Sequence, residues 1–282
     1  MNTRFRPTPY RDLHLGHIWT AWHNWSYAAE GGDEFILIAD DIAYNLQHLH
    51  EQSWSVTKAI ARFCEDLTWL GIPPTQVIFS TRNAEAHAEA AAVLNLSPPG
   101  IRADTSFRGP LVCTPEGAQM SMYHPWLVMT RVVDDALAGV EAFVRGSELV
   151  TEAELYDHFH RVLYGGLPPR QRYIPVVRRE ENAEKESKSL GSCSLRELRE
   201  AGYTPREIID TLRECDRRSR AADLRDTVIP AGVLEPQETR TLAFADSYRH
   251  RMATAWETRA QEPWGEDVMR MSERFATKGV AP

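Results

Sequence analysis

Residues 34–41, Glu-Phe-Ile-Leu-Ile-Ala-Asp-Asp, contain a short β-rich run, Glu34–Ala39, that leads into two acidic residues. Three similar runs follow, at 76–80, 140–145 and 172–177, and the segments between them read as amphipathic helices. Alternating strands and helices predict an α/β fold in which helices cover a parallel sheet. Ligands of such folds bind beyond the carboxyl ends of the strands, so functional residues are expected where strands pass into helices.

The pattern changes after the last of these runs. From Ser194 onward the sequence predicts helices only, over 195–201, 205–217 and 238–259. We therefore predict two domains, an α/β domain over residues 1–190 and a helical domain over residues 191–282.

Composition narrows the class of protein. The 282 residues are 43% hydrophobic and 26% charged, with a net charge of -8. No apolar run approaches the roughly 20 residues of a membrane span, and the N-terminus lacks the apolar core of a secretory signal. We expect a soluble cytoplasmic protein with no membrane partner.

The four cysteines, Cys64, Cys113, Cys193 and Cys215, lie far apart in the sequence. Zinc sites and disulfide frameworks have closer, characteristic cysteine spacings, such as two cysteines separated by two residues. We therefore predict no structural zinc and no metal ligands in this chain.

The N-terminal segment Arg4-Phe5-Arg6-Pro7-Thr8-Pro9 is followed by His14-Leu15-Gly16-His17. At the start of a helix, His14 and His17 would lie about one turn apart on one face. There they could donate to phosphate oxygens beside the free N–H groups of the helix. Gly16 would let a flat base approach the backbone. Two surface histidines would be the ordinary explanation of such a tetrapeptide taken alone.

A second candidate segment is Lys185-Glu186-Ser187-Lys188-Ser189, in a polar stretch at the end of the α/β region. Lysines in a loop could follow negative charge as pyrophosphate leaves, and so stabilise a transition state more than bound ATP. The alternative is a solvated surface loop. The lysine segment follows the two histidines in the sequence at a separation that favours the functional interpretation.

Together these segments resemble the catalytic domain of class I glutamyl-tRNA synthetases. Residues 4–17 are similar to the family's N-terminal signature, and 185–189 to its lysine loop. Further similar stretches lie between and after them in the same order: 35–41, 69–71, 132–139, 144–149 and 194–203. The resemblance implies a Rossmann-like parallel sheet with a helical domain after it, and an enzyme that forms an aminoacyl adenylate from ATP with Mg²⁺.

The resemblance also implies roles for single residues. His14, His17, Lys185 and Lys188 would be catalytic, and ATP would be bound by His14, Gly16, His17, Glu148 and Lys188. Arg4 would hold the side-chain carboxylate of glutamate, and Thr8 would help to seat the amino acid. Asp40 would meet the α-ammonium, and Arg145 would face a carboxylate. A dicarboxylate with one ammonium suits two arginines and one acid, because arginine binds carboxylates through two N–H groups.

Two positions of the predicted amino-acid site depart from the family's pattern. Leu127 stands where the family has a tyrosine, and Arg131 where it has asparagine or a small residue. One explanation is a modified or more acidic glutamate analogue as the substrate. The other is local repacking, with Arg131 paired to Asp40 or Asp134.

Larger departures concern the acceptor. About thirty residues, 95–124, replace the insertion that binds the acceptor end of tRNA in the family, and the family's zinc ligands are absent. With roughly ninety residues after the lysine loop, we also expect no anticodon-binding domain. Its size resembles the short glutamyl-queuosine tRNA(Asp) synthetases, without their zinc motif. In residues 95–124 only Arg102 and Arg108 are basic, so tRNA is a disfavoured partner.

Three hypotheses follow. The first is a ligase that passes activated glutamate, or a close analogue, to a small molecule, a carrier or a modified nucleoside. The second is a glutamyl-queuosine-type enzyme that uses tRNA, favoured by overall length and by the arginines of 196–220. The third is a non-catalytic paralogue that binds an amino acid or a partner for regulation. The presence of both histidines, Lys188 and the arginines counts against the third.

Overall fold

The structure is a computed structural model. It describes residues 1–9, 12–42, 55–96, 125–179, 194–222, 224, 226–230 and 233–234, and the backbone of residues 112–113 and 119–120. The chain forms two compact units. The first comprises 1–10, 20–56 and 74–174, and the second comprises 11–19, 57–73 and 175–282. The predicted domain boundary at residues 190 and 191 lies outside the described residues and stays a prediction.

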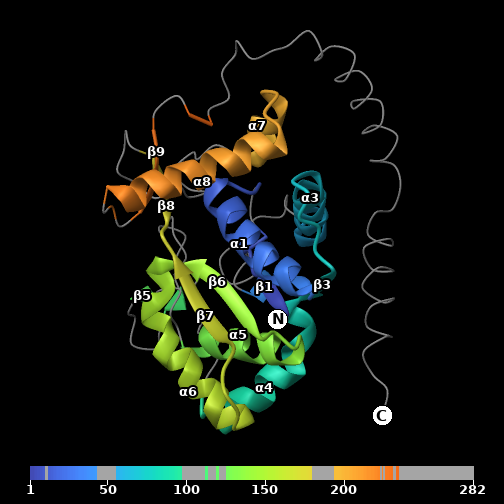
Figure 1. Ribbon diagram of the computed structural model, residues 1–282. Coiled ribbons are helices and arrows are strands. Elements are labelled where there is room, and N and C mark those ends of the chain that lie inside the picture. The colour runs from blue at the N-terminus through green and yellow to red at the C-terminus, as the bar shows by residue number, and fades with distance from the viewer. Residues whose placement is uncertain are drawn as a thin grey trace, which may run out of the picture. The chain divides into compact units, whose positions relative to one another are not determined.

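The first unit contains a five-stranded sheet in which every neighbouring pair of strands is parallel (Figure 1). Its order is β3-β2-β1-β6-β7. The strands are β1 (Thr3–Phe5), β2 (Phe35–Ala39), β3 (Gln76–Phe79), β6 (Ala142–Gly146) and β7 (Arg170–Ile174). Strands predicted at 34–39, 76–80 and 140–145 are confirmed, and the run at 172–177 is divided between β7 and a later strand. The predicted Rossmann-like α/β fold is therefore confirmed.

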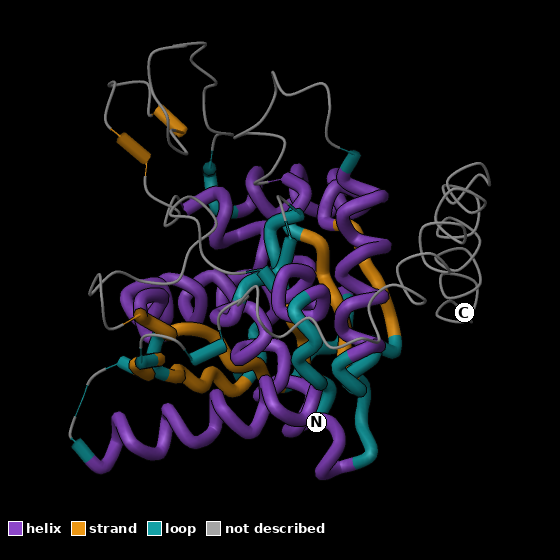
Figure 2. The backbone as a smooth tube through the Cα atoms, turned by 90° about the horizontal axis from the view of Figure 1, so that it is seen from above, coloured by secondary structure: helices purple, strands orange, loops and turns teal. Residues whose placement is uncertain are grey.

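Strand β2 shows why this sheet lies inside the unit. All five of its residues, Phe-Ile-Leu-Ile-Ala, are buried, so side chains on both faces are covered. Such continuous apolar strands are typical of parallel sheets packed between helices. Ile36 and Ile38 share a core with Phe143 of β6 and with apolar residues of three helices. These helices are α4 (Ala84–Val93), α5 (Pro125–Leu137) and α6 (Ala153–Tyr164). Helices flank the strands in the view from above (Figure 2).

The strand order reverses between β1 and β6. These two strands pair through Thr3 and Ala142, and Asn24 of helix α1 (Leu15–Gly31) supplies hydrogen bonds beyond that point. The Asn24 side chain donates to the carbonyl of Val144 over 2.8 Å and accepts from its N–H over 2.8 Å. Buried backbone groups need partners, and Asn24 provides them where the strands separate. In open parallel sheets the crevice at such a reversal is the usual ligand site.

Shorter elements complete the first unit. The 3-10 helices η1 (Ser80–Asn83) and η2 (Ser147–Glu152) directly follow β3 and β6, at the carboxyl end of the sheet. Within the stretch 95–124, predicted as a shortened insertion, the described backbone forms two antiparallel strands, β4 (Val112–Cys113) and β5 (Gln119–Met120).

The second unit contains α3 (Val56–Trp69), α7 (Leu195–Glu200), α8 (Pro205–Ala221), and the start of α1. Ser194 and Thr204 begin α7 and α8 with capping boxes, in which each hydroxyl accepts from the backbone N–H three residues later. These two helices confirm the predictions at 195–201 and 205–217, whereas 238–259 lies outside the described residues.

The expectation of helices only after Ser194 is wrong at one place. Strand β9 (Thr227–Ile229) pairs in parallel with β8 (Val177–Arg179) (Figure 1). Hydrogen bonds to α8 hold β9: Thr227 donates to Asp216 over 3.0 Å, and the N–H of Val228 donates to Ser219 over 2.9 Å. Three residues are too few to show a period in sequence, so this strand depends on its tertiary partners.

Candidate active site

The first unit gathers charged side chains beyond the reversal between β1 and β6. Arginines come from β1 and the residue after it, from α5 and from β6, and carboxylates come from the end of β2, from α5 and from η2. In the described residues of this unit, four buried guanidinium groups pair with four buried carboxylates. They are Arg4, Arg6, Arg131 and Arg145, and Asp40, Asp134, Asp135 and Glu152.

Arg4 is held by α5 and by aromatic rings. Its Nε and Nη2 donate to the two oxygens of Asp135 over 3.0 and 3.2 Å, and its Cζ lies 4.1 Å from the centre of the Phe143 ring. Asp135 also accepts from the Tyr156 hydroxyl over 2.8 Å. Burial raises the pKa of Tyr156, and the adjacent Asp135 raises it further. The Arg4 guanidinium thus faces a protein carboxylate, Asp135. Its predicted role at a substrate carboxylate stays a prediction.

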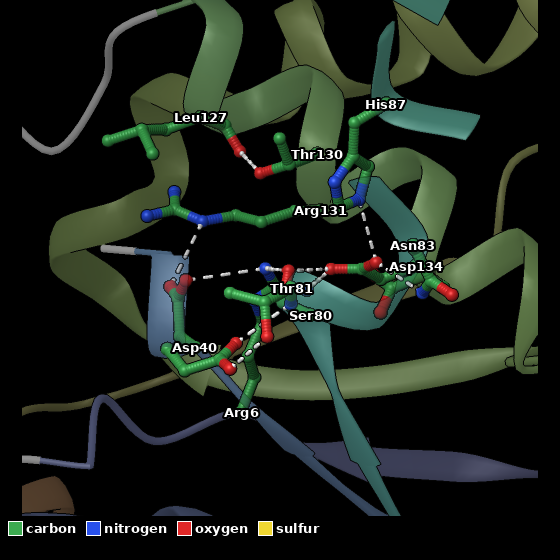
Figure 3. A network of polar contacts seen from close by, with 12 residues as sticks. Arg6, Asp40, Ser80, Thr81, Asn83, His87, Leu127, Thr130, Arg131 and Asp134 are labelled. Carbon is green, nitrogen blue, oxygen red and sulfur yellow. Dashed lines mark hydrogen bonds and ion pairs between the residues drawn. The ribbon is translucent and has the colours of Figure 1, made fainter. Parts of the chain in front are cut away.

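Arg6 connects the end of β1 with the ends of β2 and β3 (Figure 3). Its Nη1 donates to Asp134 over 2.7 Å, and its Nη2 lies 3.4 Å from Asp40 and 3.1 Å from Ser80. The backbone N–H of Asp40 donates to the carbonyl of Pro7 over 3.0 Å, which joins the same two segments. Burial lowers the pKa of Arg6, but Asp40 and Asp134 outweigh it, so the pKa is raised.

Asp134 is the centre of this part of the network. It accepts from Ser80 over 2.5 Å and from the Asn83 amide over 2.7 Å, and it lies 2.9 Å from Nε2 of His87 (Figure 3). Burial raises the pKa of Asp134, but Arg6, His87 and Asn83 outweigh it and hold the pKa at about 2. The carboxylate is therefore ionised at neutral pH. It holds the residues that follow β1 and β3 against helix α5.

Arg131 pairs with two carboxylates. Its Nη1 donates to Glu152 over 2.7 Å, and its Nε lies 3.9 Å from Asp40, as the dashed line in Figure 3 marks. This contact is the Asp40 pairing expected under local repacking. The added cation of Arg131 therefore has carboxylate partners inside the protein, and the alternative of a more acidic substrate stays a prediction. Burial raises the pKa of Asp40, but Arg6 and Arg131 outweigh it, so the pKa is lowered.

Arg145 makes the second contact to Glu152. Its Nη1 donates to Glu152 over 2.9 Å, and its Nη2 donates to Gln171 and to the Tyr173 hydroxyl over 2.7 and 2.9 Å. Glu152 was missed by sequence reasoning. It lies in the short segment Ser147–Glu152, whose pattern does not mark an acidic residue as buried. The arginine at position 131, where the family has asparagine or a small residue, was the available signal that a buried carboxylate partner was needed.

The remaining predicted residues of this unit lie near the same end of the sheet. Leu127 is one helical turn before Arg131 on α5 and presents a buried aliphatic side chain. Thr8 is half-buried in the segment after β1. Glu148 lies in η2, with its carboxylate against Gly146, so that a Cβ atom at residue 146 would require the Glu148 side chain to shift. Their predicted roles toward the amino acid and ATP stay predictions.

In the second unit, His14 and His17 lie together at the start of α1. Their ring centres are 3.7 Å apart with 34° between the ring planes, and the backbone N–H of Gly16 donates to Nδ1 of His14 over 3.1 Å. The predicted arrangement, two imidazoles beside helix N–H groups, is present. Their assignment to ATP stays a prediction.

The chain after the lysine segment runs beside these histidines. Ser194 forms an antiparallel bridge with His14, and the N–H of Leu195 donates to the carbonyl of Leu13 over 2.7 Å. Lys185 and Lys188 themselves lie in residues 180–193, outside the described residues. Ser194 is the first described residue after that segment, and it lies beside His14.

No group of three or more histidine, cysteine or acidic side chains that could hold a metal occurs in the part of the chain that the structure describes. Cys64 and Cys215 are free thiols there. Burial raises the pKa of Cys64 to about 12, with a smaller effect from Glu65. The prediction that the chain lacks structural zinc stays open to measurement. No helix among the described residues is long and apolar enough to cross a membrane.

Comparison with known proteins adds to this geometry. Residues 1–95 match the family model of the catalytic domain of class I tRNA synthetases for glutamate and glutamine (E and Q). The glutamate–tRNA ligase of Burkholderia multivorans is 24% identical, over 75% of this chain and 57% of the relative. That of Desulfosudis oleivorans is 26% identical, over 74% of this chain and 55% of the relative. The chain thus spans little more than half the length of these relatives.

Solved structures support the same fold. A glutamate tRNA ligase of Elizabethkingia meningosepticum, solved in complex with its amino acid, superposes with a TM-score of 0.53 at 15% identity. The match covers 75% of this chain and 60% of that chain. A glutamate–tRNA synthetase of Elizabethkingia anophelis gives the same values. The sheet order and these comparisons agree: residues 1–95 are similar to the class I catalytic domain for glutamate and glutamine, and the chain has the fold of glutamate–tRNA ligases.

Proposed function

We propose that the protein is a ligase that activates an amino acid, glutamate or a close analogue, with ATP to form an aminoacyl adenylate. One observation supports this most: buried arginines and Asp40 gather at the reversal of the sheet in a domain of this class. Magnesium would enter with ATP as the counter-ion of its phosphates. Such chemistry belongs in the cytoplasm, where ATP and free amino acids are present.

The amino acid would bind in the first unit. Asp40 is buried and ionised, so it suits an α-ammonium group, and Arg145 suits a carboxylate. Leu127 and Thr8 would bound the amino acid, and Arg131 would help to orient its carboxylate. Binding of the substrate's α-ammonium and α-carboxylate would fix which carboxylate meets ATP.

ATP would be bound with the help of His14, Gly16 and His17, because the start of α1 brings two imidazoles together at the positive end of the helix dipole, where phosphate oxygens bind favourably. Glu148 would lie near the nucleotide. In the reaction, an oxygen of the amino-acid carboxylate forms a bond to the α-phosphorus, and the bond from that phosphorus to pyrophosphate breaks. Lys185 and Lys188 would stabilise the charge that develops on the leaving pyrophosphate.

The acceptor would be a small molecule, a carrier or a modified nucleoside. Residues 95–124 are few for an RNA-binding subdomain. The described arginines of α8 also lie in ion pairs with acidic residues of the same helix, which leaves this helix close to neutral. Both observations disfavour a tRNA acceptor, whose phosphates require clustered unpaired cations.

Pyrophosphate exchange tests the activation step. Protein, ATP, Mg²⁺ and a panel of acidic amino acids and their amides should incorporate labelled pyrophosphate into ATP without added tRNA. His17→Asn should lower the rate by on the order of a hundredfold. His158→Asn is the matched control, because His158 is exposed on α6 and should leave the rate unchanged. Absence of exchange with every amino acid, with and without tRNA, would support the non-catalytic paralogue instead.

A transfer assay then identifies the acceptor. Labelled amino acid is incubated with protein, ATP and total tRNA, and the label is followed through periodate treatment and nuclease digestion. Label in small molecules alone supports the proposal. Label on an internal modified base supports the glutamyl-queuosine-type enzyme, and label on a terminal adenosine contradicts the proposed acceptor.

A further inference from the structure

Glu152 is a carboxylate that the protein supplies to two arginines of the candidate amino-acid site. It is the last residue of η2, and its side chain is 0% exposed. Its Oε2 accepts from Arg131 over 2.7 Å, and its Oε1 accepts from Arg145 over 2.9 Å. Burial raises the pKa of Glu152, but Arg131 and Arg145 outweigh it, so the pKa is lowered. Glu152 therefore carries a full negative charge at neutral pH.

The charges around Glu152 divide into two groups. Arg131, Arg145 and Glu152 together carry one surplus positive charge. Arg6, Asp40 and Asp134 together carry one surplus negative charge. Arg131 links the two groups through its contact with Asp40. A ligand that matches this arrangement has one carboxylate and one ammonium group, and no net charge.

The positive charges of the site are already shared with protein carboxylates: Glu152 pairs with both Arg131 and Arg145, and Asp135 pairs with Arg4. Both terminal nitrogens of Arg145 already donate to protein oxygens, and its buried Nε has no partner among the described residues. Arg4 is engaged by both oxygens of Asp135. A second ligand carboxylate would be buried without a cation of its own, which strongly disfavours binding.

We infer that Glu152 is a specificity-determining residue, which reserves this site for an amino acid whose side chain is uncharged. The inference rests on the proposed function, which it narrows: the close analogue of glutamate would carry an amide, ester or other neutral group in place of the side-chain carboxylate. Glu152 would act by electrostatic exclusion, since its own charge replaces that of the substrate's second carboxylate.

Glutamate and glutamine are suitable probes because they have almost the same shape and differ by one charge. Wild-type protein should bind L-glutamine more tightly than L-glutamate in calorimetric titrations, and should use it in pyrophosphate exchange with a kcat/KM about tenfold higher or more. Glu152→Gln keeps the shape of the side chain and removes its charge. This variant should reverse the preference toward glutamate by about tenfold or more.

Glu154→Gln is the matched control, because it makes the same chemical change two residues away at an exposed position. It should keep the wild-type preference. Thermal unfolding would show whether Glu152→Gln folds. If it does not, the wild-type ranking decides: a preference for glutamate over glutamine overturns the inference.

The two proposals fail in different ways. Binding of glutamine without exchange of pyrophosphate would contradict the proposed activation and leave the role of Glu152 standing. Exchange that favours glutamate, equally in wild type and in Glu152→Gln, would overturn the role of Glu152 and leave the activation standing. Neither binding nor exchange with any amino acid would overturn both.

Discussion

Arg4 and Asp135 form a two-pronged ion pair between the first strand of the sheet and helix α5, with N–O distances of 3.0 and 3.2 Å. The pair is almost fully buried, with side chains 6% and 0% exposed. The Tyr156 hydroxyl donates to the same carboxylate, and Phe143 packs under the guanidinium. Arg4 thus joins β1, α5, α6 and β6, and these contacts favour a structural role over substrate recognition.

This relationship predicts the effect of Asp135→Asn. The variant leaves the Arg4 charge buried without its carboxylate, so the free energy of unfolding should fall by about 3–5 kcal/mol. Urea denaturation measures the change. Arg206→Lys provides a surface comparison, since Arg206 pairs with Asp210 while 91% exposed, and should change stability by less than about 0.5 kcal/mol. A stability change in Asp135→Asn no larger than in Arg206→Lys would show that Arg4 is available to a ligand.

Lys188→Ala should lower the rate of adenylate formation by on the order of a hundredfold, with little change in ATP affinity. The reason is that a lysine of this segment would act on charge that develops only as pyrophosphate leaves. Single-turnover kinetics and equilibrium ATP binding separate the two effects. Lys58→Ala, on α3, is the control and should leave both unchanged. An equal loss of ATP affinity and rate would contradict the transition-state role.

Asp66 should make stability depend on pH. Burial, with a smaller effect from the nearby Asp12, raises the pKa of Asp66 to about 7. The folded state therefore holds a proton that the unfolded state releases near its ordinary pKa of about 3.9. Stability from this group is present below pH ~4 and is lost as the pH rises toward about 7.

Asp66→Asn should remove this dependence and raise the free energy of unfolding at pH 8, by on the order of a few kcal/mol. Urea denaturation between pH 4 and pH 8 measures it. Glu85→Gln, at an exposed position of α4, should keep the wild-type pH profile. A parallel profile in Asp66→Asn and wild type would show that Asp66 titrates as an ordinary carboxylate.

Metal analysis tests the cysteine prediction. Four scattered cysteines cannot readily supply a compact tetrahedral set, so the purified protein should contain far less than one zinc per chain. Mass spectrometry of protein purified without chelators makes the measurement, and treatment with a chelator should leave the unfolding temperature unchanged. One bound zinc per chain, lost together with stability on chelation, would overturn the prediction.

The sequence by itself determined the α/β class, three of the strands and the helices at 195 and 205. These features depend on local patterns: continuous apolar runs such as Phe35–Ala39, and capping residues such as Ser194 and Thr204. It also identified the histidines at the start of α1, because their spacing of three is meaningful along a helix.

Only the tertiary structure decided which charges meet. Arg4 and Asp135 lie 131 residues apart, and Arg131 and Glu152 lie 21 apart, so no periodicity connects them. Whether an arginine binds a ligand or a protein carboxylate depends on which groups are desolvated together, since ion pairs gain their strength from burial and proximity. The sequence identified the cations, and the packing of α5, β6 and η2 assigned their partners, because electrostatic pairing acts through space and not along the chain.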